Sequence, residues 1–336
     1  MGKIVYLRAK ESKTKASSCE IYVGLETWLA SKPANTRAQY LRLANEWTRF
    51  LGYEPTERSA KRGWQTAKYI DAQRWVNEIK KRPAQPGRST EASANGCVSM
   101  ATVKHKVSVL SSLYDQLLAQ GLVEANPFKR LVIELKKHAS GARRPHVRIP
   151  KESVEKLIKF KPKDREQLRD LAIFNLFFGA ALRRCEVVAL RLTDVKRSDK
   201  GTTYLRLVVT KSQKVQEVAL PNWVASVVNR YVDQRMNEEA SPTDPLFIVY
   251  RVNGRVTALS SSTVYRIFKA YCRMFGLPDN FTPHCARVTA ITQMLDQNFS
   301  HRDVQELSRH SSVTMVEKYD RRRHDVDQSA SKKLEY

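Results

Sequence analysis

Apolar residues recur at helical spacing through the first half of the chain. They predict, as the first ordered element, a helix that begins after Thr36 and ends at Gly52, then a helix from about Asp71 and another that ends before Gly121. The apolar faces of these helices comprise Tyr40, Leu43, Trp47 and Phe50; Ala72, Trp75, Val76 and Ile79; and Val103, Val107, Leu110, Tyr114 and Leu117. Residues 81–99, rich in Pro, Gly and Ser, are expected to form a loop. This pattern is typical of a small helical bundle.

The second half mixes helical and extended patterns. Residues 151–182 predict two helices, and the later one is so apolar that it must be buried. Alternating apolar positions at 202–210 and 216–220 predict two strands, with a hairpin turn between them. Further predicted elements are a helix after Pro221 carrying Trp223, Val227, Tyr231 and Met236, a short strand at 246–250, and helices from Ser260 to Gly276 and from Pro283. The fold is therefore expected to be mainly α with small β elements, an α+β fold.

The two halves are expected to be separate domains. Residues 1–18 are polar and basic and predict a flexible arm, followed by a helical domain at 19–136. Residues 137–149 form a basic linker that could cross a phosphate backbone, although a solvated linker fits its composition equally well. A second domain at 150–324 and a tail at 325–336 complete the predicted organisation.

The net charge of the chain indicates what kind of partner it binds. The 336 residues include 59 Lys and Arg against 34 Asp and Glu, which gives a formal net charge of +25, while 42% hydrophobic residues suffice for real cores. Basic side chains placed against phosphates release condensed counterions, so a strongly basic chain favours a polyanion such as nucleic acid. The composition excludes wholesale disorder and predicts a nucleic-acid partner.

The sequence predicts neither a membrane protein nor a secreted one. The longest apolar run, 171–182, contains Asn175 and is shorter than the roughly 20 residues that span a bilayer. Residues 1–15 lack the apolar core of a secretory signal. The five cysteines include no CxxC pair, which argues against a zinc site or a disulfide framework. We therefore expect a cytoplasmic protein without a metal or cofactor.

Candidate chemistry gathers near the C-terminus. His284, Arg287, His310 and Tyr319 lie within 36 positions of one another. Arg offers a planar fork of donors to anionic oxygens, His moves protons near neutral pH, and Tyr can attack phosphorus. Thr282 as N-cap and a proline at the first helical position would place His284 and Arg287 on one face of a helix N-terminus, where an anion is favoured. This mixture suits chemistry on a phosphodiester.

Two segments of the second half resemble catalytic motifs of the tyrosine recombinases, the phage-type integrases. Arg183, in Gly179-Ala-Ala-Leu-Arg-Arg-Cys-Glu-Val-Val-Ala-Leu190, matches the family's first arginine box, G-L-R-x-x-E-L, and Glu186 falls on its acidic position. The hairpin at 210–220 resembles the segment with the catalytic lysine and assigns that role to Lys211, with Lys214 as the alternative. Ser212 and Gln216 depart from the family pattern there.

The remaining motifs extend the resemblance over roughly residues 20–325. His284-Cys-Ala-Arg287 matches the H-x-x-R box, His310 matches the later histidine box, and Tyr319, nine residues on, is the expected nucleophile. Arg309 stands where the family usually has Gly, so we expect a different backbone geometry at that turn. The first half resembles the family's core-binding domain.

The resemblance implies a fold and an activity. A core-binding domain and a catalytic domain would form a C-shaped clamp on double-stranded DNA, and four protomers would exchange strands at specific core sites through a Holliday junction. The reaction would be site-specific recombination, by integration, excision or resolution of a DNA element, through a 3′-phosphotyrosyl intermediate without metal or ATP. The tail at 325–336 would dock on a neighbouring protomer. An accessory or directionality factor and a nucleoid location in the cytoplasm are further expectations.

Each matched residue receives a role. Arg183 and Arg287 would neutralise the scissile phosphate, and His310 would hydrogen-bond a non-bridging oxygen. His284 is the expected base for Tyr319, because a phenol with a pKa near 10 attacks poorly unless its proton is removed. The resemblance makes Lys211 the group that protonates the departing 5′ oxygen.

Two other activities are open from the sequence. A type IB topoisomerase uses a similar residue set and would relax supercoils as a monomer with little site preference. A DNA-binding protein on the same fold, without catalysis, is the second alternative. The helical first half and the six matched positions favour the recombinase.

Overall fold

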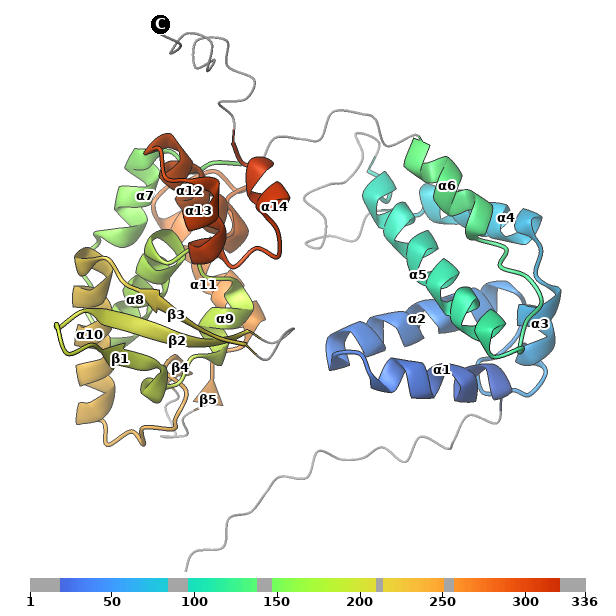
Figure 1. Cartoon of the computed structure of the whole chain (residues 1–336), viewed down its shortest axis with the longest axis horizontal. Helices are drawn as coiled ribbons and strands as arrows, with labels where there is room; N and C mark the ends of the chain where they lie inside the picture. The colour runs from blue at the N-terminus through green and yellow to red at the C-terminus, as the bar shows by residue number, and fades with distance from the viewer. Residues whose placement is uncertain (1–18, 84–95, 138–146, 210–213, 251–256, 321–336) are drawn as a thin grey trace, which may run out of the picture. The chain divides into compact units, whose positions relative to one another are not determined.

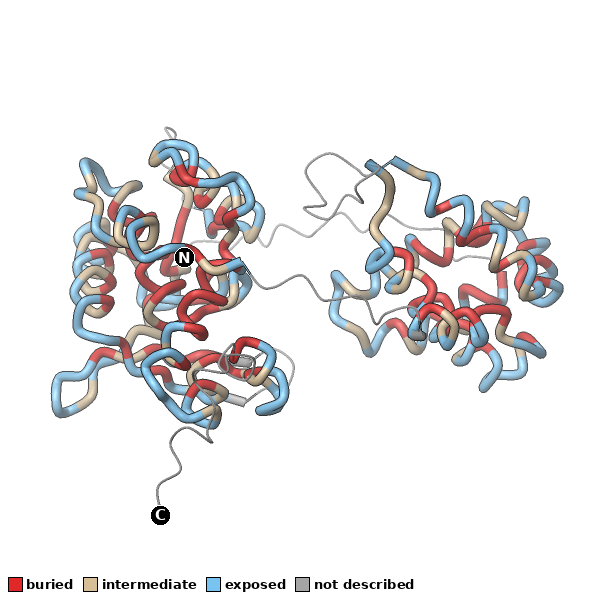
Figure 2. The backbone as a smooth tube through the Cα atoms, turned by 90° about the horizontal axis from the view of Figure 1, so that it is seen from above, coloured by how far each residue is buried: buried red, intermediate tan, exposed pale blue. Residues whose placement is uncertain are grey.

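The computed structural model of the chain describes residues 19–83, 96–137, 147–209, 214–250 and 257–320. The chain divides into two compact units, Met1–Arg143 and Arg144–Tyr336, and each unit encloses its own buried segments (Figure 2). Helices predominate in both, and the strands are short. The expectation of a mainly α fold with small β elements is confirmed.

The secondary-structure elements named in the described part of the first unit are all helices (Figure 1). Its helices are α1 (Glu20–Ala30), α2 (Ala34–Phe50), α3 (Ala60–Thr66), α4 (Tyr69–Lys81), α5 (Met100–Ala119) and α6 (Lys129–Lys137). Helix α5 contacts α1, α2, α4 and α6. The indole of Trp47 meets the rings of Trp75 and Phe128 edge to face, with centroids 5.8 and 4.8 Å away. Its buried Nε1 donates to the Tyr114 hydroxyl at 2.9 Å, so the aromatic centre leaves this polar atom paired.

The sequence placed the first helix too late. Helix α1 precedes the one predicted after Thr36 and buries Ile21, Tyr22, Leu25 and Leu29. Helix α2 also begins earlier, at Ala34, because Pro33 takes the extended conformation that precedes a helix. Helix α4 begins at Tyr69, since the Asp71 carboxylate accepts the Lys68 backbone N–H and so caps the first turn.

The second unit contains helices around two small antiparallel sheets (Figure 1). Its elements are α7 (Lys151–Ile158), α8 (Arg165–Gly179), α9 (Arg184–Ala189), the 3₁₀ turn η1 (Leu192–Asp194), β1 (Val195–Arg197), β2 (Thr203–Val209), β3 (Lys214–Ala219), α10 (Asn222–Asn237), β4 (Ile248–Val249), β5 (Thr257–Ala258), α11 (Ser261–Met274), α12 (Pro283–Asp296), α13 (His301–Ser308) and α14 (Val313–Glu317). Within the described residues, the sheets have the orders β1-β2-β3 and β4-β5. The predicted hairpin is present, with Leu205 opposite Val218 and Val209 opposite Lys214.

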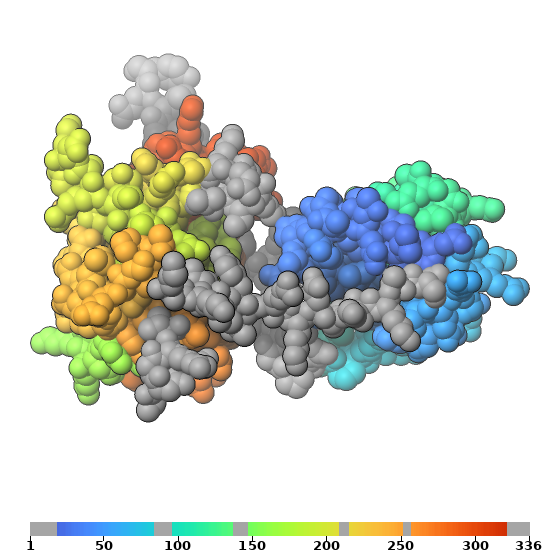
Figure 3. All heavy atoms as spheres, turned by 90° about the horizontal axis from the view of Figure 1, so that it is seen from below, coloured from blue at the N-terminus to red at the C-terminus, as the bar shows by residue number. Residues whose placement is uncertain are grey.

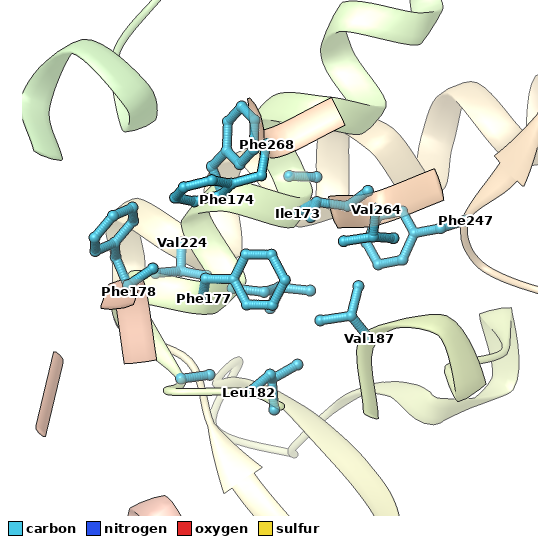
Figure 4. Packing of buried hydrophobic residues seen from close by; sticks show 14 of the residues in the cluster. Ile173, Phe174, Phe177, Phe178, Leu182, Val187, Val224, Phe247, Val264 and Phe268 are labelled. Carbon is cyan, nitrogen blue, oxygen red and sulfur yellow. The ribbon is translucent and has the colours of Figure 1, made fainter. Parts of the chain in front are cut away.

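Helix α8 forms the centre of the second unit and contacts α7, α10 and α12. Residues 168–178 of this helix are buried, as the apolar run predicted. The rings of Phe174 and Phe268 meet edge to face with centroids 5.7 Å apart, and Phe177 lies beside them (Figure 4). The one polar residue of the run, Asn175, donates its amide to the Leu171 carbonyl at 2.9 Å. A buried amide is therefore tolerated because it is hydrogen-bonded.

The buried face of α10 differs from the prediction. Trp223 and Met236 are exposed, and the buried face comprises Val224, Val228, Tyr231 and Arg235. The adjacent pairs 223–224 and 227–228 each supply two apolar residues, so helical spacing fits either face. Seen as spheres, α10 in gold and the neighbouring strands in yellow form a continuous surface (Figure 3).

Among the described helices, none combines the length and apolarity required to cross a bilayer.

Candidate active site

The first segment of the site is the turn between α8 and α9, which carries Arg183. Leu182 is fully buried and fixes this turn in the core. Arg183 is the N-cap of α9 with extended backbone, and its N–H donates to Glu186 Oε2 at 2.7 Å. Its Nη1 donates to Glu186 Oε1 at 2.8 Å, while 36% of the side chain stays exposed. The same carboxylate therefore caps the helix and orients a partly exposed guanidinium.

Arg287 lies on α12 and is only 3% exposed. Its guanidinium donates to the carbonyls of Ala181 and Ser308, so it ties the α8–α9 turn to the end of α13. Burial, followed by the positive charges of Arg183 and Arg309, lowers the pKa of Arg287 to about 9. Cations this close destabilise one another unless an anion lies among them. Among the described residues, Glu186 is the main group that opposes this repulsion.

His310 lies next to Arg287 and is held at both ring nitrogens. Nε2 is 3.3 Å from Arg287 Nη2, and Nδ1 is 2.9 Å from Ser308 Oγ. A guanidinium only donates, so Nε2 accepts and the proton is assigned to Nδ1, which donates to the serine. Burial and the charges of Arg287, Arg183 and Arg309 lower the pKa of His310 to about 4. The imidazole is therefore neutral at pH 7.

Tyr319 follows α14 and stacks on His310. The two rings lie 5.6 Å apart between centroids at an interplanar angle of 16°. The tyrosine is only 8% exposed, and this burial raises the pKa of Tyr319, although Arg287 and Arg183 act against the rise. A phenol in this place keeps its proton at neutral pH. It needs a base, or an additional stabilising charge, before it can act as a nucleophile.

The turn before His310 keeps the backbone that a glycine favours. Arg309 has φ 57° and ψ 41°, in the left-handed region, and is the C-cap of α13. The expected change of backbone geometry at this position is therefore not found. The side chain is turned inward, where Nη2 pairs with Glu186 Oε2 at 3.0 Å. Burial acts against ionisation of Glu186, but Arg309 and Arg183 together lower the pKa of this carboxyl.

Thr282 caps α12 as expected, with its hydroxyl accepting from the Cys285 N–H at 3.3 Å. His284 and Arg287 lie three positions apart on α12, as predicted, with His284 exposed and Arg287 buried. The charge of His284 is still among those that lower the pKa of His310. Lys211 lies outside the described residues, and Lys214 begins β3 opposite Val209.

The structure brings Arg183, Arg287, His310 and Tyr319 together from segments up to 136 positions apart. Sequence reasoning gave no role to Ser308, which holds the His310 ring, or to the Ala181 carbonyl, which accepts from Arg287. The spacing of Arg183 and Glu186 matched a capping box and was the available signal for their bond. Within the described ranges, no group of three or more His, Cys, Asp or Glu side chains forms a set of metal ligands.

Known sequences resemble this chain over most of its length. The family model for the phage integrase family matches residues 147–325. Tyrosine recombinase XerC of Syntrophus aciditrophicus is 26% identical over 312 residues, which is 89% of this chain and 89% of that protein. Tyrosine recombinase XerA of Pyrococcus furiosus is 32% identical over 173 residues, covering 52% of this chain and 56% of that protein.

Solved structures share the fold. The Tn1549 transposon integrase, in complex with circular intermediate DNA, superimposes with a TM-score of 0.67 at 19% identity and covers 95% of this chain and 99% of its own. A lambda integrase dimer bound to a core site gives a TM-score of 0.61 at 18% identity, covering 89% of this chain and 94% of that one. At this identity the likeness concerns the fold.

Proposed function

This chain belongs to the phage integrase family and is a tyrosine site-specific recombinase, and we propose that it cuts and rejoins double-stranded DNA through a covalent bond between Tyr319 and a 3′ phosphate. The observation that carries the proposal is the stacking of Tyr319 on His310 beside two guanidiniums in one chain. The Tn1549 and lambda integrase structures, solved with DNA, support DNA as the partner.

Arg183 and Arg287 bind the scissile phosphate in this mechanism. Arg183 is partly exposed and preoriented by Glu186, and the pKa of Arg287 is lowered to about 9 by burial and by the neighbouring guanidiniums. A phosphate between them relieves the repulsion that lowers this pKa. The repulsion is relieved further as negative charge grows in the transition state, and this difference accelerates the reaction.

His310 binds a non-bridging oxygen of the same phosphate. When the anion receives the Nη2 donor that now faces the imidazole, Nε2 must donate rather than accept. The Ser308 hydroxyl permits this change of tautomer because it can donate to Nδ1 as well as accept from it. A nearby phosphate also raises the pKa of His310, so a larger fraction of the imidazole is protonated and can donate from both nitrogens when DNA is bound.

Cleavage is a single displacement at phosphorus. His284 takes the proton of the Tyr319 hydroxyl, the phenol oxygen bonds to phosphorus, and the bond from phosphorus to the 5′ oxygen breaks. Lys211 protonates this oxygen, with Lys214 as the alternative. The 3′-phosphotyrosyl bond retains the energy of the phosphodiester, so attack by another strand's 5′ hydroxyl reseals the DNA without ATP, metal or cofactor.

The assembly follows from the chemistry. Each protomer cuts one strand, so exchange between two duplexes at their core sites requires a homotetramer acting in two rounds through a Holliday junction. We propose a core-binding domain at 19–136, a linker at 137–149 and a catalytic domain at 150–324 that close around DNA, with a basic arm at 1–18. The tail at 325–336 docks on the next protomer. The enzyme acts on cytoplasmic, nucleoid DNA, and an accessory factor sets the direction.

Tyr319→Phe tests the chemistry because it removes only the attacking oxygen. A pool of duplexes with randomised sites, each nicked so that the released strand end diffuses away, is incubated with the wild type, and covalently bound DNA is recovered after denaturation and sequenced. The wild type is expected to enrich one site and to form an adduct sensitive to protease.

The variant should bind the enriched duplex within about twofold of the wild type and form no adduct. Adduct at the wild-type level from Tyr319→Phe would contradict the mechanism. A supercoiled plasmid without the enriched site serves as the control for topoisomerase activity, and rapid relaxation of it by a monomer would favour that alternative.

A further inference from the structure

Arg309 occupies a position that is unfavourable in two ways. Its backbone is left-handed, at φ 57°, where side chains with a Cβ are strained. Its side chain carries a positive charge and is only 1% exposed. A glycine would avoid both costs, and an exposed arginine would avoid the second. Strain and buried charge persist only where the surrounding contacts over-determine them, and the contacts of Arg309 point to the site.

Arg309 reaches Arg183 by two routes. Its own carbonyl accepts from Arg183 Nη2 at 2.9 Å, and its Nη2 donates to Glu186 Oε2 at 3.0 Å. The other oxygen of this carboxylate, Oε1, holds Arg183 Nη1 at 2.8 Å. Glu186 therefore lies between two guanidiniums, one buried and one partly exposed. Withdrawal of the buried one would leave Arg183 as the main partner of the carboxylate.

Arg309 also reaches the neighbourhood of Arg287, through Ala181. Like Arg309, Ala181 is a non-glycine residue with a positive φ, at 46°. Its carbonyl accepts from Arg309 Nη2 at 3.0 Å and also from Arg287 Nη1. The two strained turns are thus joined by one guanidinium, and Arg287 is hydrogen-bonded at the junction.

We propose that Arg309 is a positioning residue: its buried guanidinium locks Glu186 and the Ala181 turn, and thereby holds Arg183 and Arg287 in the orientation that receives the scissile phosphate. This proposal rests on the proposed function. It adds that the chain uses a buried arginine, at a turn that suits a glycine, to make an internal support for two phosphate-binding arginines. The charge of Arg309 also helps to lower the pKa of His310, which keeps the imidazole neutral until an anion arrives.

Arg309→Gly and Arg309→Lys test the proposal together. The glycine variant relieves the left-handed backbone and removes the guanidinium, and the lysine variant keeps a charge but loses the planar fork. Arg302→Ala, which removes an exposed charge from the same helix α13, is the matched control.

The first readout needs no DNA. Histidine carbon and proton resonances of the free protein are titrated by NMR, with His310 assigned from a His310→Gln variant. We expect the pKa of His310 to rise in Arg309→Gly, because one of the positive charges that lower it is removed, and to stay near the wild-type value in Arg309→Lys and Arg302→Ala. An unchanged pKa in Arg309→Gly would overturn the proposed placement of its charge.

The second readout is single-turnover cleavage of the nicked duplex enriched above, at saturating DNA. Arg309→Gly and Arg309→Lys should bind that duplex within about twofold of the wild type and cleave it at least tenfold more slowly, with the full amplitude. A reduced amplitude at the wild-type rate would show that the residue only supports folding, and would overturn the proposal. Absence of any adduct from the wild type would instead refute the proposed function, and the NMR titration would still test whether the charge of Arg309 lies beside His310.

Discussion

At the scale of one residue, the lowered pKa of His310 predicts how the free energy of unfolding depends on pH. Its pKa is lowered to about 4 in the folded protein, against about 6.5 in an unfolded chain. Between these values the unfolded chain binds a proton that the folded protein does not bind. The free energy of unfolding should therefore fall as the pH drops from 6.5 toward 4, by about 1–2 kcal/mol once the partial exposure of the ring is allowed for.

His310→Gln removes this proton site and is the test. Urea unfolding of both proteins between pH 7 and pH 4 gives the two stability curves, and their difference cancels carboxylates that titrate in both. The wild-type curve should be steeper in this window. Parallel curves would mean that the folded protein protonates the imidazole as readily as the unfolded chain does.

Residue identities were easier to predict than residue contacts. Arg183, Arg287, His310 and Tyr319 were found from motif order, and the structure brings them together. Arg309 was recognised only as a departure, because its partner Glu186 lies 123 positions away and no local spacing links them. Pairing over such a distance is decided by packing, which a single sequence does not display.

At the scale of elements, the close contact at Gly179 predicts how tightly α8 packs on α10. A Cβ at this position would lie 2.2 Å from Val224 Cγ2 and 3.1 Å from the Trp223 ring. Gly179→Ala should therefore destabilise the protein by about 1–3 kcal/mol, although alanine is the better helix former. Urea unfolding of the wild type and the variant gives the difference in their free energies of unfolding.

Val224→Ala provides the matched background, because it removes the methyl group that a Cβ at 179 would strike. In this background the cost of Gly179→Ala should shrink by about 1 kcal/mol, as expected for residues in contact. Equal costs in the two backgrounds would mean that α8 and α10 shift apart instead of clashing.

Helices with a capped start or a long apolar run were predictable, and two short helices were not. The run at 171–178 and the capped starts at Ser260 and Thr282 were placed correctly. Helices α3 and α6, of seven and nine residues, offer too few turns for a period to be recognised. In α10, two adjacent apolar pairs left the buried face ambiguous until α8 selected Val224 over Trp223.

The formal net charge of +25 makes a prediction at the scale of the whole molecule. If roughly 6–10 phosphates are contacted, affinity for duplex DNA should fall by about 10³–10⁵ between 50 and 200 mM salt, since each contact releases counterions. The Tyr319→Phe variant allows this to be measured as a pure binding equilibrium, by fluorescence anisotropy of the enriched duplex.

A duplex of unrelated sequence is the control for this measurement. Both duplexes should lose affinity with similar slopes, because phosphate contacts are shared and base contacts depend little on salt. Affinity that is independent of salt would remove the electrostatic basis on which a DNA partner was predicted. The predicted clamp around DNA concerns the arrangement of the two units and stays a prediction.

Tyr319 stacks on the histidine of its own chain, and this predicts how an inactive subunit would affect a mixed assembly. If the nucleophile attacks from this position, every subunit works in cis and severs only the strand it occupies. An inactive subunit in a mixed assembly would then fail to cleave its own strand, while its neighbours would still cleave theirs. Complementation between one copy lacking the tyrosine and another lacking an arginine would fail, since neither could lend the other its missing part.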